Sequence, residues 1–360
     1  MQESRVTYLD NIDGLNSYLR KNFSTSSSII FVDSNVSSQY KFDENFNTHE
    51  ILVNEETKNI TTVDKIWEIM HSNSVTRSTN VICIGGGVLC DVVGFATSTY
   101  KRGANLLLIP TTLLAMVDAS HGGKNGVNNN YGKNQIGTFY LPNEILVCVE
   151  FLNSLNKEEI NTGLIEVIKA GFIGNNKILE LVYGDDSVYS DKSLLQLAID
   201  VKTKITKEDL KESNTRMYLN FGHTIGHLIE SDSNYQISHG QAVGIGILIA
   251  LEISEKEYNL NQSYRKNYMT FLNNSGLKSH YKFKDKYKIK FDLLADEEIK
   301  VLKKYKVWGK KKFMGREFMG IIRSTYLIDK KGKILKVWDN VKVKDHAKEV
   351  LETLQNIVKK

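Results

Sequence analysis

An apolar run that ends directly in three glycines sets the strongest constraint on the fold of this chain. Residues 79–87 read TNVICIGGG, and similar apolar runs occur at 28–36 (SIIFVDSNV) and 105–115 (NLLLIPTTLLA). Glycine lets the backbone approach a ligand closely, and the helix that follows such a turn points its N-terminus at a pyrophosphate. Helical stretches separate the apolar runs, so we predict an α/β region with a mostly parallel sheet. The motif is not GxGxxG, and a tight strand-to-helix turn without a ligand would look the same.

The pattern changes after this region. Residues 118–142 are rich in Gly, Asn and Lys and have no sustained periodicity, which predicts a long loop that either holds an anionic substrate or is only a flexible surface loop. Residues 157–183 and 191–212, the stretch from 215 through LNFGHTIGHLIE, and residues 239–257 have the apolar spacing of helices. We therefore expect an α/β domain over 1–150 and a mainly helical domain over 151–276, with the site between them.

Three of the eight histidines fall within one short segment of the helical region. His223 and His227 are four residues apart, so a helix places both rings on one face, and His239 follows in the sequence SHG. Two or three histidines that converge with a carboxylate form the ligand set of a catalytic zinc with one open position. Histidines without a metal are the alternative, which spacing alone does not exclude.

Composition excludes several classes of protein. The longest apolar runs are far shorter than a membrane span, and the N-terminal residues do not resemble a secretory signal. The chain has three cysteines, Cys83, Cys90 and Cys148, at spacings that match no known motif. An odd number at such spacings argues against a disulfide framework and favours a reducing, cytoplasmic setting.

Charge is divided unevenly along the chain. Residues 277–360 hold 24 Lys and Arg against 11 Asp and Glu, a balance of +13, whereas residues 1–276 hold 23 against 31, a balance of −8. This change suggests two segments of different origin. A basic tail is compatible with nucleic-acid binding, but no motif of that kind accompanies it, so we expect a solvated lysine-rich surface and no nucleic-acid or membrane partner.

Several motifs together resemble the 3-dehydroquinate synthases of the sugar-phosphate cyclase family. They are GGGVLCDVVGFATSTYKRG, IPTTLLAMVDASHGGKNGVN, GKNQIGTFYLP, GLIEVIKAGFI and LNFGHTIGHLIE followed by HGQAVGIG, and they occur in the family's order between about residues 28 and 275. The resemblance implies an N-terminal Rossmann-like NAD-binding domain and a mainly α-helical domain that binds metal and substrate.

The resemblance also assigns roles to individual residues. It implies that Zn²⁺ or Co²⁺ is bound by Glu166, His223 and His239. Residues implied to hold NAD are Asp33, Asn35, Glu55, Lys58, Gly85, Gly86, Gly87, Asp91, Thr111, Thr112 and Lys133. Residues implied to contact the substrate or act in catalysis are Asp118, Lys124, Asn134, Lys169, Lys202, Arg216, Asn220 and His227, with Lys133 also near the substrate. Arg102 is implied to reach the phosphate in the neighbouring subunit's site, which makes a homodimer the expected assembly.

The chemistry implied by the resemblance starts from 3-deoxy-D-arabino-heptulosonate 7-phosphate. NAD oxidises a secondary alcohol transiently, phosphate leaves, the hydride is returned, and an intramolecular aldol reaction closes the ring of 3-dehydroquinate. Lysine and arginine suit this substrate because it carries a carboxylate and a phosphate, and His227 is our candidate for a proton relay or a phosphate contact. Two positions depart from the family pattern: Asn54 replaces a glycine, and His121 replaces a small apolar residue.

The family pattern ends near Gly276. Residues 277–360 resemble the C-terminal half of a peroxiredoxin of the bacterioferritin-comigratory type, and they predict a strand, a turn at Gly332, a second strand and a closing helix, as in part of a thioredoxin-like fold. Arg323 matches the arginine that activates the thiol in such enzymes, but this segment has no cysteine, so we expect no peroxidase activity. We hypothesise a chimeric chain whose cyclase part is truncated.

Three alternatives stay open from the sequence. The first is another sugar-phosphate cyclase, such as a 2-deoxy-scyllo-inosose synthase, and the second is an inactive chimera that still binds NAD. The third is a dehydrogenase of the iron-containing alcohol dehydrogenase type, whose expected metal ligands and glycine pattern differ from those present here.

Overall fold

The structure is a computed structural model. It describes residues 3–210, 214–233, 236–277, 303–313, 316–322, 324–328, 333–339, 341 and 346–358. The chain divides into two compact units, residues 1–281 and residues 282–360, and each is described here by itself.

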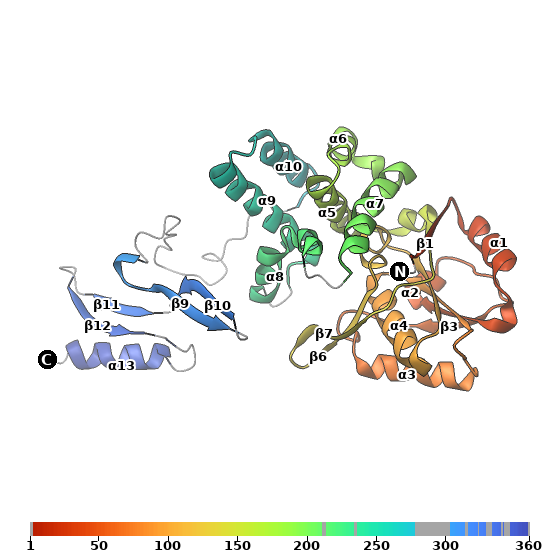
Figure 1. The fold of residues 1–360 in the computed structure, drawn as a ribbon, viewed down its shortest axis with the longest axis horizontal. Coiled ribbons are helices and arrows are strands. Elements are labelled where there is room, and N and C mark those ends of the chain that lie inside the picture. Colours follow the sequence, from red (N-terminus) through yellow and green to blue (C-terminus); the bar gives the residue numbers. More distant parts are fainter. Residues whose placement is uncertain are drawn as a thin grey trace. The chain divides into compact units, whose positions relative to one another are not determined.

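A six-stranded sheet forms the centre of the N-terminal part of the first unit (Figure 1). The strands lie in the order β1-β8-β5-β4-β2-β3, and every neighbouring pair is parallel. Their bounds are β1 Arg5–Leu9, β2 Ser28–Asp33, β3 Asn47–Ile51, β4 Asn80–Gly85, β5 Asn105–Pro110 and β8 Glu144–Cys148. The prediction of an α/β region with a parallel sheet is thus confirmed.

The central strands are covered on both faces, which explains why they read as continuous apolar runs. In β2 and β4 the residues Ile30, Phe31, Ile82 and Ile84 have no exposed surface. The helices of this part are α1 Ile12–Asn22, α2 Ser34–Ser37, α3 Ile60–Ser72 and α4 Gly87–Thr99. Short 3-10 turns cover Thr25–Ser27 (η1), Tyr100–Arg102 (η2) and Val149–Ser154 (η4), and a π-helical turn covers Ala115–Ala119 (η3).

Residues 118–142 form more than a loop, which corrects the prediction from the sequence. They contain an antiparallel hairpin of β6 Lys124–Asn129 and β7 Gly132–Phe139. β6 packs on α4, where Asn125 and Val127 are buried. The approach is close, because a Cβ at Gly94 of α4 would lie 2.0 Å from Asn125 Oδ1.

The remainder of the first unit is helical (Figure 1). Its helices are α5 Lys157–Ile173, α6 Lys177–Gly184, α7 Lys192–Glu208, α8 His223–Asp232, α9 His239–Tyr258 and α10 Ser263–Asn274, with 3-10 turns at Asp186–Ser190 (η5) and Thr215–Asn220 (η6).

Three predicted helix boundaries were wrong. The helix expected over 191–212 ends at Glu208, because Asp209 has a non-helical φ of −145°. The single helix expected over 157–183 is two helices, α5 and α6, because α5 ends at Gly174, whose φ of −147° is not helical. The helix expected from residue 215 begins only at His223. Gly222 just before it has a φ of +80°, a left-handed conformation that interrupts a right-handed helix.

The second unit contains two antiparallel strand pairs and a helix. β9 Trp308–Phe313 pairs with β10 Arg316–Ile321, β11 Thr325–Ile328 pairs with β12 Ile334–Trp338, and α13 spans His346–Val358. The predicted strand pair and closing helix are confirmed as local elements. Gly332 and Arg323, named in the same prediction, lie outside the described residues.

Across the residues that the structure describes, every helix is too short or too polar to cross a membrane.

Candidate active site

The carboxyl ends of β2, β4 and β5 place the residues expected to hold NAD along one edge of the sheet. Asp33 ends β2, Gly85 ends β4, and Thr111 and Thr112 follow β5. Ligands of open parallel sheets bind at this edge. A Cβ at Gly85 would lie 2.7 Å from Leu89 Cδ2, so glycine leaves room for the Leu89 side chain of α4 to pack closely on the end of β4. The N-terminus of α4 is therefore available to an anionic group.

Charged and amide side chains complete this wall of the site. Lys58 is buried and donates hydrogen bonds to Asp91 Oδ2 at 2.5 Å and to Asn134 Oδ1 at 2.7 Å. Burial raises the pKa of Asp91, although the positive charge of Lys58 opposes that rise. Lys133 Nζ lies 3.9 Å from Glu55 Oε1. The hairpin β6–β7 thus contributes Lys133 and Asn134 to the same region as Glu55 and Lys58.

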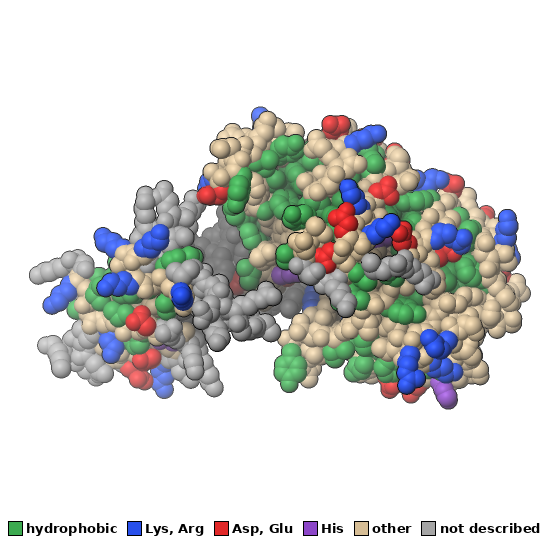
Figure 2. Space-filling model, in the orientation of Figure 1, with side chains coloured by type: hydrophobic (Ala, Val, Ile, Leu, Met, Phe, Trp, Pro, Cys, Tyr) green, Lys and Arg blue, Asp and Glu red, His purple; other side chains and the backbone are tan. Residues whose placement is uncertain are grey.

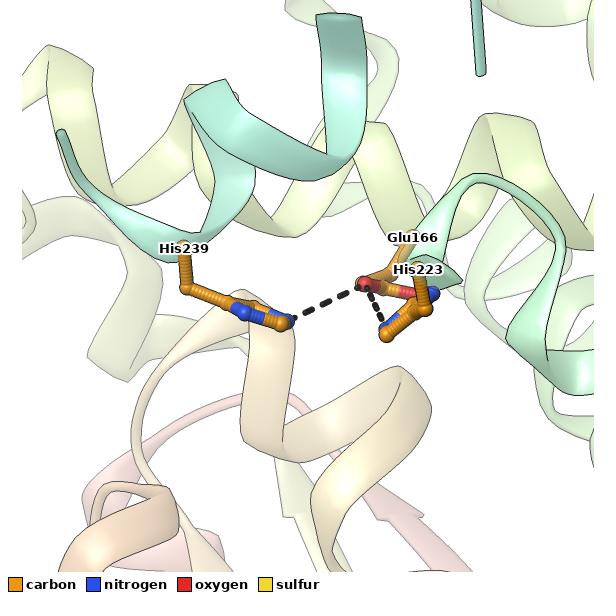
Figure 3. Close-up of side chains that lie close together, drawn as sticks. All are labelled: Glu166, His223 and His239. Atoms are coloured by element: carbon orange, nitrogen blue, oxygen red, sulfur yellow. Dashed lines mark ion pairs between the residues drawn. The ribbon is translucent and has the colours of Figure 1, made fainter. Parts of the chain in front are cut away.

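The three expected metal ligands converge from three helices (Figure 3). Glu166 projects from the middle of α5, whereas His223 and His239 are the first residues of α8 and α9. Glu166 Oε1 lies 3.6 Å from His223 Nε2 and 3.7 Å from His239 Nε2. Tetrahedral zinc with bonds of about 2.0–2.1 Å separates its ligand atoms by roughly 3.4 Å, so the observed separations fit a metal ion after a small contraction.

Glu166 gives an independent indication that these residues fit a cation. Its Oε1 atom is buried and makes no hydrogen bond, and a buried polar atom without a partner is costly. The other oxygen, Oε2, forms an ion pair with Lys169 one turn along α5. Burial by itself would raise the pKa of Glu166, but the positive charge of Lys169 lowers it to about 2, so the carboxylate is ionised.

The two ligand histidines differ in their surroundings. Burial lowers the pKa of His223 to about 4, which keeps its ring neutral near pH 7, the form that binds a metal. Burial would also lower the pKa of His239, but its contacts with Glu166 and Glu230 raise that pKa to about 10 in the absence of a metal. His239 therefore lies between two carboxylates.

A second group of charges lies beside this cluster. Asp118 Oδ1 lies 2.7 Å from Lys202 Nζ and 3.7 Å from Lys169 Nζ. Burial opposes ionisation of Asp118, but the two lysines hold the pKa of its carboxyl well below the usual range. The Arg216 guanidinium is buried and donates to two backbone oxygens, those of Leu210 at 2.6 Å and Gly122 at 3.1 Å.

Three of the expected substrate residues lie at the surface of this unit. Lys124 is the first residue of β6, and Asn220 is the last residue of η6. Arg102 is exposed and has a φ of +66°, a left-handed conformation that is rare for a residue with a side chain. His227 lies on the same face of α8 as His223, with the two ring centroids 5.4 Å apart.

One cavity joins the two halves of the site. Its volume is about 1260 Å³, and its walls include Asp33, Lys58 and Thr112 at one end and His227 and His239 at the other. The other expected residues that line it are Asn35, Glu55, Gly86, Gly87, Asp91, Thr111, Asp118, Lys133 and Asn134. Most of the predicted NAD residues and one predicted metal ligand, His239, therefore share one continuous space. The expected residues outside its lining are Gly85, Arg102, Lys124, Glu166, Lys169, Lys202, Arg216, Asn220 and His223.

Glu230, which was not among the residues predicted from the sequence, also lines this cavity. Its Oε2 lies 3.4 Å from His239 Nδ1, and its Oε1 lies 4.0 Å from Lys133 Nζ. The available signal was its position on α8, three residues after His227 and seven after His223, which places all three on one helical face.

Comparison with known families agrees with this geometry. A profile of the N-terminal part of 3-dehydroquinate synthases matches residues 48–162, and a profile of their C-terminal part matches residues 163–304. Residues 48–304 belong to the 3-dehydroquinate synthase family. The second match continues beyond residue 276, where the family pattern was expected to end. Most of residues 277–304 lie outside the described part of the chain.

Individual relatives agree with this assignment. The chain is 46% identical over 209 residues to the 3-dehydroquinate synthase of Pyrococcus abyssi, an alignment that covers 58% of this chain and 63% of that protein. The chain therefore matches less than two thirds of the length of this relative.

Among solved structures, the fold resembles 2-epi-5-epi-valiolone synthase from Streptomyces hygroscopicus, a structure with NAD⁺ and Zn²⁺ bound. The TM-score is 0.69 at 25% identity, covering 78% of this chain and 82% of the other. A 2-deoxy-scyllo-inosose synthase complexed with carbaglucose-6-phosphate, NAD⁺ and Co²⁺ has a TM-score of 0.65 at 26% identity, covering 76% and 80%.

Proposed function

We propose that this chain is an NAD- and divalent metal-dependent 3-dehydroquinate synthase, a phosphorus-oxygen lyase of the shikimate pathway that serves chorismate and aromatic amino acid biosynthesis. It would convert 3-deoxy-D-arabino-heptulosonate 7-phosphate into 3-dehydroquinate and phosphate. The observation that carries the proposal is the cavity that runs from the glycine turn after β4 to His239, whose ring converges with Glu166 and His223.

NAD is the proposed occupant of the sheet end of the cavity. The N-terminus of α4 would face its pyrophosphate, and Asp33 would accept hydrogen bonds from a ribose, as acidic residues do at this edge of nucleotide-binding sheets. The cyclase neighbours with NAD⁺ in their structures support this assignment. When bound, NAD would accept a hydride from the substrate and later return it.

Glu166, His223 and His239 would hold the metal, which would act as a Lewis acid on the hydroxyl oxygen that is oxidised. The charges nearby suit an anionic substrate. Asp118 and Glu166 are balanced by Lys169 and Lys202, so a bound divalent cation leaves the region with a net charge of about +2, which favours a carboxylate or a phosphate. Lys169 and Lys202 would bind and orient these groups, and His227 would move a proton at the phosphate end.

The direct test measures phosphate release from the heptulosonate phosphate in the presence of NAD and Zn²⁺ or Co²⁺. We expect release that depends on the metal and is abolished by EDTA and by His223→Ala, with no net formation of NADH. Net formation of NADH would instead indicate an alcohol dehydrogenase. Folded protein that binds NAD but releases no phosphate would favour the inactive binder.

The second candidate function is that of a sugar-phosphate cyclase other than 3-dehydroquinate synthase. It is favoured by the structural neighbours, which are a 2-epi-5-epi-valiolone synthase and a 2-deoxy-scyllo-inosose synthase. Identification of the product separates the two candidates. We expect 3-dehydroquinate, whereas a carbocyclic product from a hexose phosphate or another heptulose phosphate would support the second candidate.

A homodimer is also part of the proposal. The strained turn at Lys101 and Arg102 holds the Arg102 guanidinium at the surface, where a partner's site is the proposed target. Mass measurement in solution tests the assembly, and mixed dimers of Arg102→Ala and His223→Ala chains test whether the two sites share residues. The C-terminal family profile matches as far as residue 304, so the expected end of the cyclase pattern near Gly276 is wrong. The resemblance of the residues after 304 to a peroxiredoxin stays a prediction, as does the chimeric origin of the chain.

A further inference from the structure

Glu230 lines the cavity but has no assigned role in the proposed reaction. It lies on α8 with its carboxylate buried, and it faces the first residue of α9 rather than a solvent-exposed cation. His239 Nδ1 lies 3.4 Å from Glu230 Oε2, while His239 Nε2 faces Glu166 Oε1 at 3.7 Å. Each nitrogen of this ring thus points at a different carboxylate.

The two contacts of His239 assign different tasks to its nitrogens. A neutral imidazole carries one proton, so a nitrogen that binds a metal leaves the proton on the other nitrogen. Glu230 makes a hydrogen-bonding contact with Nδ1 and therefore favours the tautomer with the proton there and a lone pair on Nε2. Carboxylates that hold a ligand histidine in this way raise its basicity and fix the orientation of its ring.

We infer that Glu230 is a positioning residue that orients His239 and keeps its Nε2 available to a divalent cation. The inference rests on the proposed function, because it needs Glu166, His223 and His239 to form the metal site. It also gives a reason for burying a carboxylate on α8, where Lys133 Nζ lies 4.0 Å from the other oxygen of Glu230.

A competing arrangement uses the same residues. His227, Glu230 and His239 each offer a ligand atom within 4.8 Å of the others, so these three side chains are a possible second cation site. That arrangement would make Glu230 a metal ligand instead of a hydrogen-bond acceptor. The number of bound metal ions and the effect of His227→Ala distinguish the two arrangements.

The experiment compares Co²⁺ binding to metal-free wild type, Glu230→Ala, Glu230→Gln and the control Glu252→Gln, whose carboxylate on α9 is half exposed. Binding is measured by calorimetry and by the visible spectrum of the bound ion, and NAD binding and thermal unfolding report on folding. We expect one Co²⁺ per chain, an affinity about 10- to 100-fold lower in Glu230→Ala with an altered spectrum, and unchanged NAD binding. Glu230→Gln should restore part of the affinity, because its amide oxygen still accepts from Nδ1, and Glu252→Gln should match wild type.

Two results would overturn the inference while leaving the proposed metal site intact. One is that the wild type and both Glu230 variants bind Co²⁺ with the same affinity and the same visible spectrum. The other is two Co²⁺ ions per chain, of which one is lost in both Glu230→Ala and His227→Ala. Failure of the proposed metal site gives a different result. In that case the wild type either binds no Co²⁺ or binds Co²⁺ that is retained in His223→Ala.

Discussion

The Lys202 ammonium group binds both the side chain and the backbone of Asp118. Its Nζ lies 2.7 Å from Asp118 Oδ1 and donates a hydrogen bond to the backbone oxygen of Asp118 at 2.6 Å. Lys202 comes from α7 and Asp118 from the π-helical turn η3, and both side chains are largely buried. The pair therefore holds Asp118, which lines the cavity, in a fixed position.

Replacing Lys202 by Met should impair both stability and substrate binding. The change leaves Asp118 with the more distant Lys169, at 3.7 Å, and breaking a buried ion pair costs about 3 kcal/mol. We expect a lower midpoint of urea unfolding and a higher KM for the sugar phosphate. Lys204→Met, at an exposed position on the same helix, is the control and should behave as wild type. A Lys202→Met protein with unchanged stability would show that this ion pair contributes little.

The sequence predicted the parallel sheet because strands covered on both faces need continuous apolar runs. The grouping of Glu166 with His223 and His239 was implied by the family resemblance, and the structure brings the three side chains together. Their role as metal ligands stays a prediction.

Features that depend on contacts between distant segments were not predictable in this way. The hairpin β6–β7 shows no alternation of apolar and polar residues, since Asn125 and Gly126 are buried with Val127. Glu230 looks like an ordinary acidic residue on an amphipathic helix. Its contact with His239 depends on the packing of α9 against α8, which brings the two side chains to within 3.4 Å of each other.

Chelation should lower the thermal stability of the protein as well as its activity. Without a cation, Glu166 Oε1 is a buried atom without a hydrogen-bond partner. A metal present at 100 times its Kd stabilises the folded state by about 2.7 kcal/mol, so EDTA should lower Tm and excess Zn²⁺ should restore it. His223→Ala is the matched control, and its Tm should respond to neither reagent. An equal response in wild type and His223→Ala would place the metal elsewhere.

Glu144 should make the free energy of unfolding fall more steeply as the pH is lowered into the acid range. It is buried in β8 and accepts hydrogen bonds from Arg5, Thr7 and Tyr18. Burial opposes ionisation of Glu144, but these donors lower its pKa below the ordinary value of 4.5. Its contribution is therefore complete above pH 4.5 and is lost as the pH falls through the lower pKa of the folded state.

Glu144→Gln tests this dependence. The variant should lose about 2 kcal/mol at pH 7, the scale of hydrogen bonds to a charged group, and less at pH 3. Urea unfolding of wild type and variant at the two pH values measures the difference. If Glu144→Gln lost the same free energy of unfolding at pH 7 and at pH 3, the charge of Glu144 would not be the source of its stabilisation.

Gly246 controls the spacing of the two helices that begin with the metal ligands. Figure 2 shows hydrophobic side chains at the surface of this helical part, but the contact between α8 and α9 depends on close backbone packing. A Cβ at position 246 would lie 2.0 Å from the backbone oxygen of Gly222, the residue directly before His223. Gly246→Ala must therefore move α8 away from α9 and change the separation of His223 from His239.

We expect Gly246→Ala to lower the free energy of unfolding by about 2 kcal/mol, as overpacking of a core does, and to weaken Co²⁺ binding. Gly184→Ala is the matched control. Its Cβ would meet no atom within 4 Å at the end of α6, so it should leave metal binding unchanged and stabilise the chain by up to about 1 kcal/mol. Gly246→Ala with wild-type Co²⁺ affinity would mean that the ligand geometry tolerates separation of the helices, and the spacing of α8 and α9 would then not set the metal site.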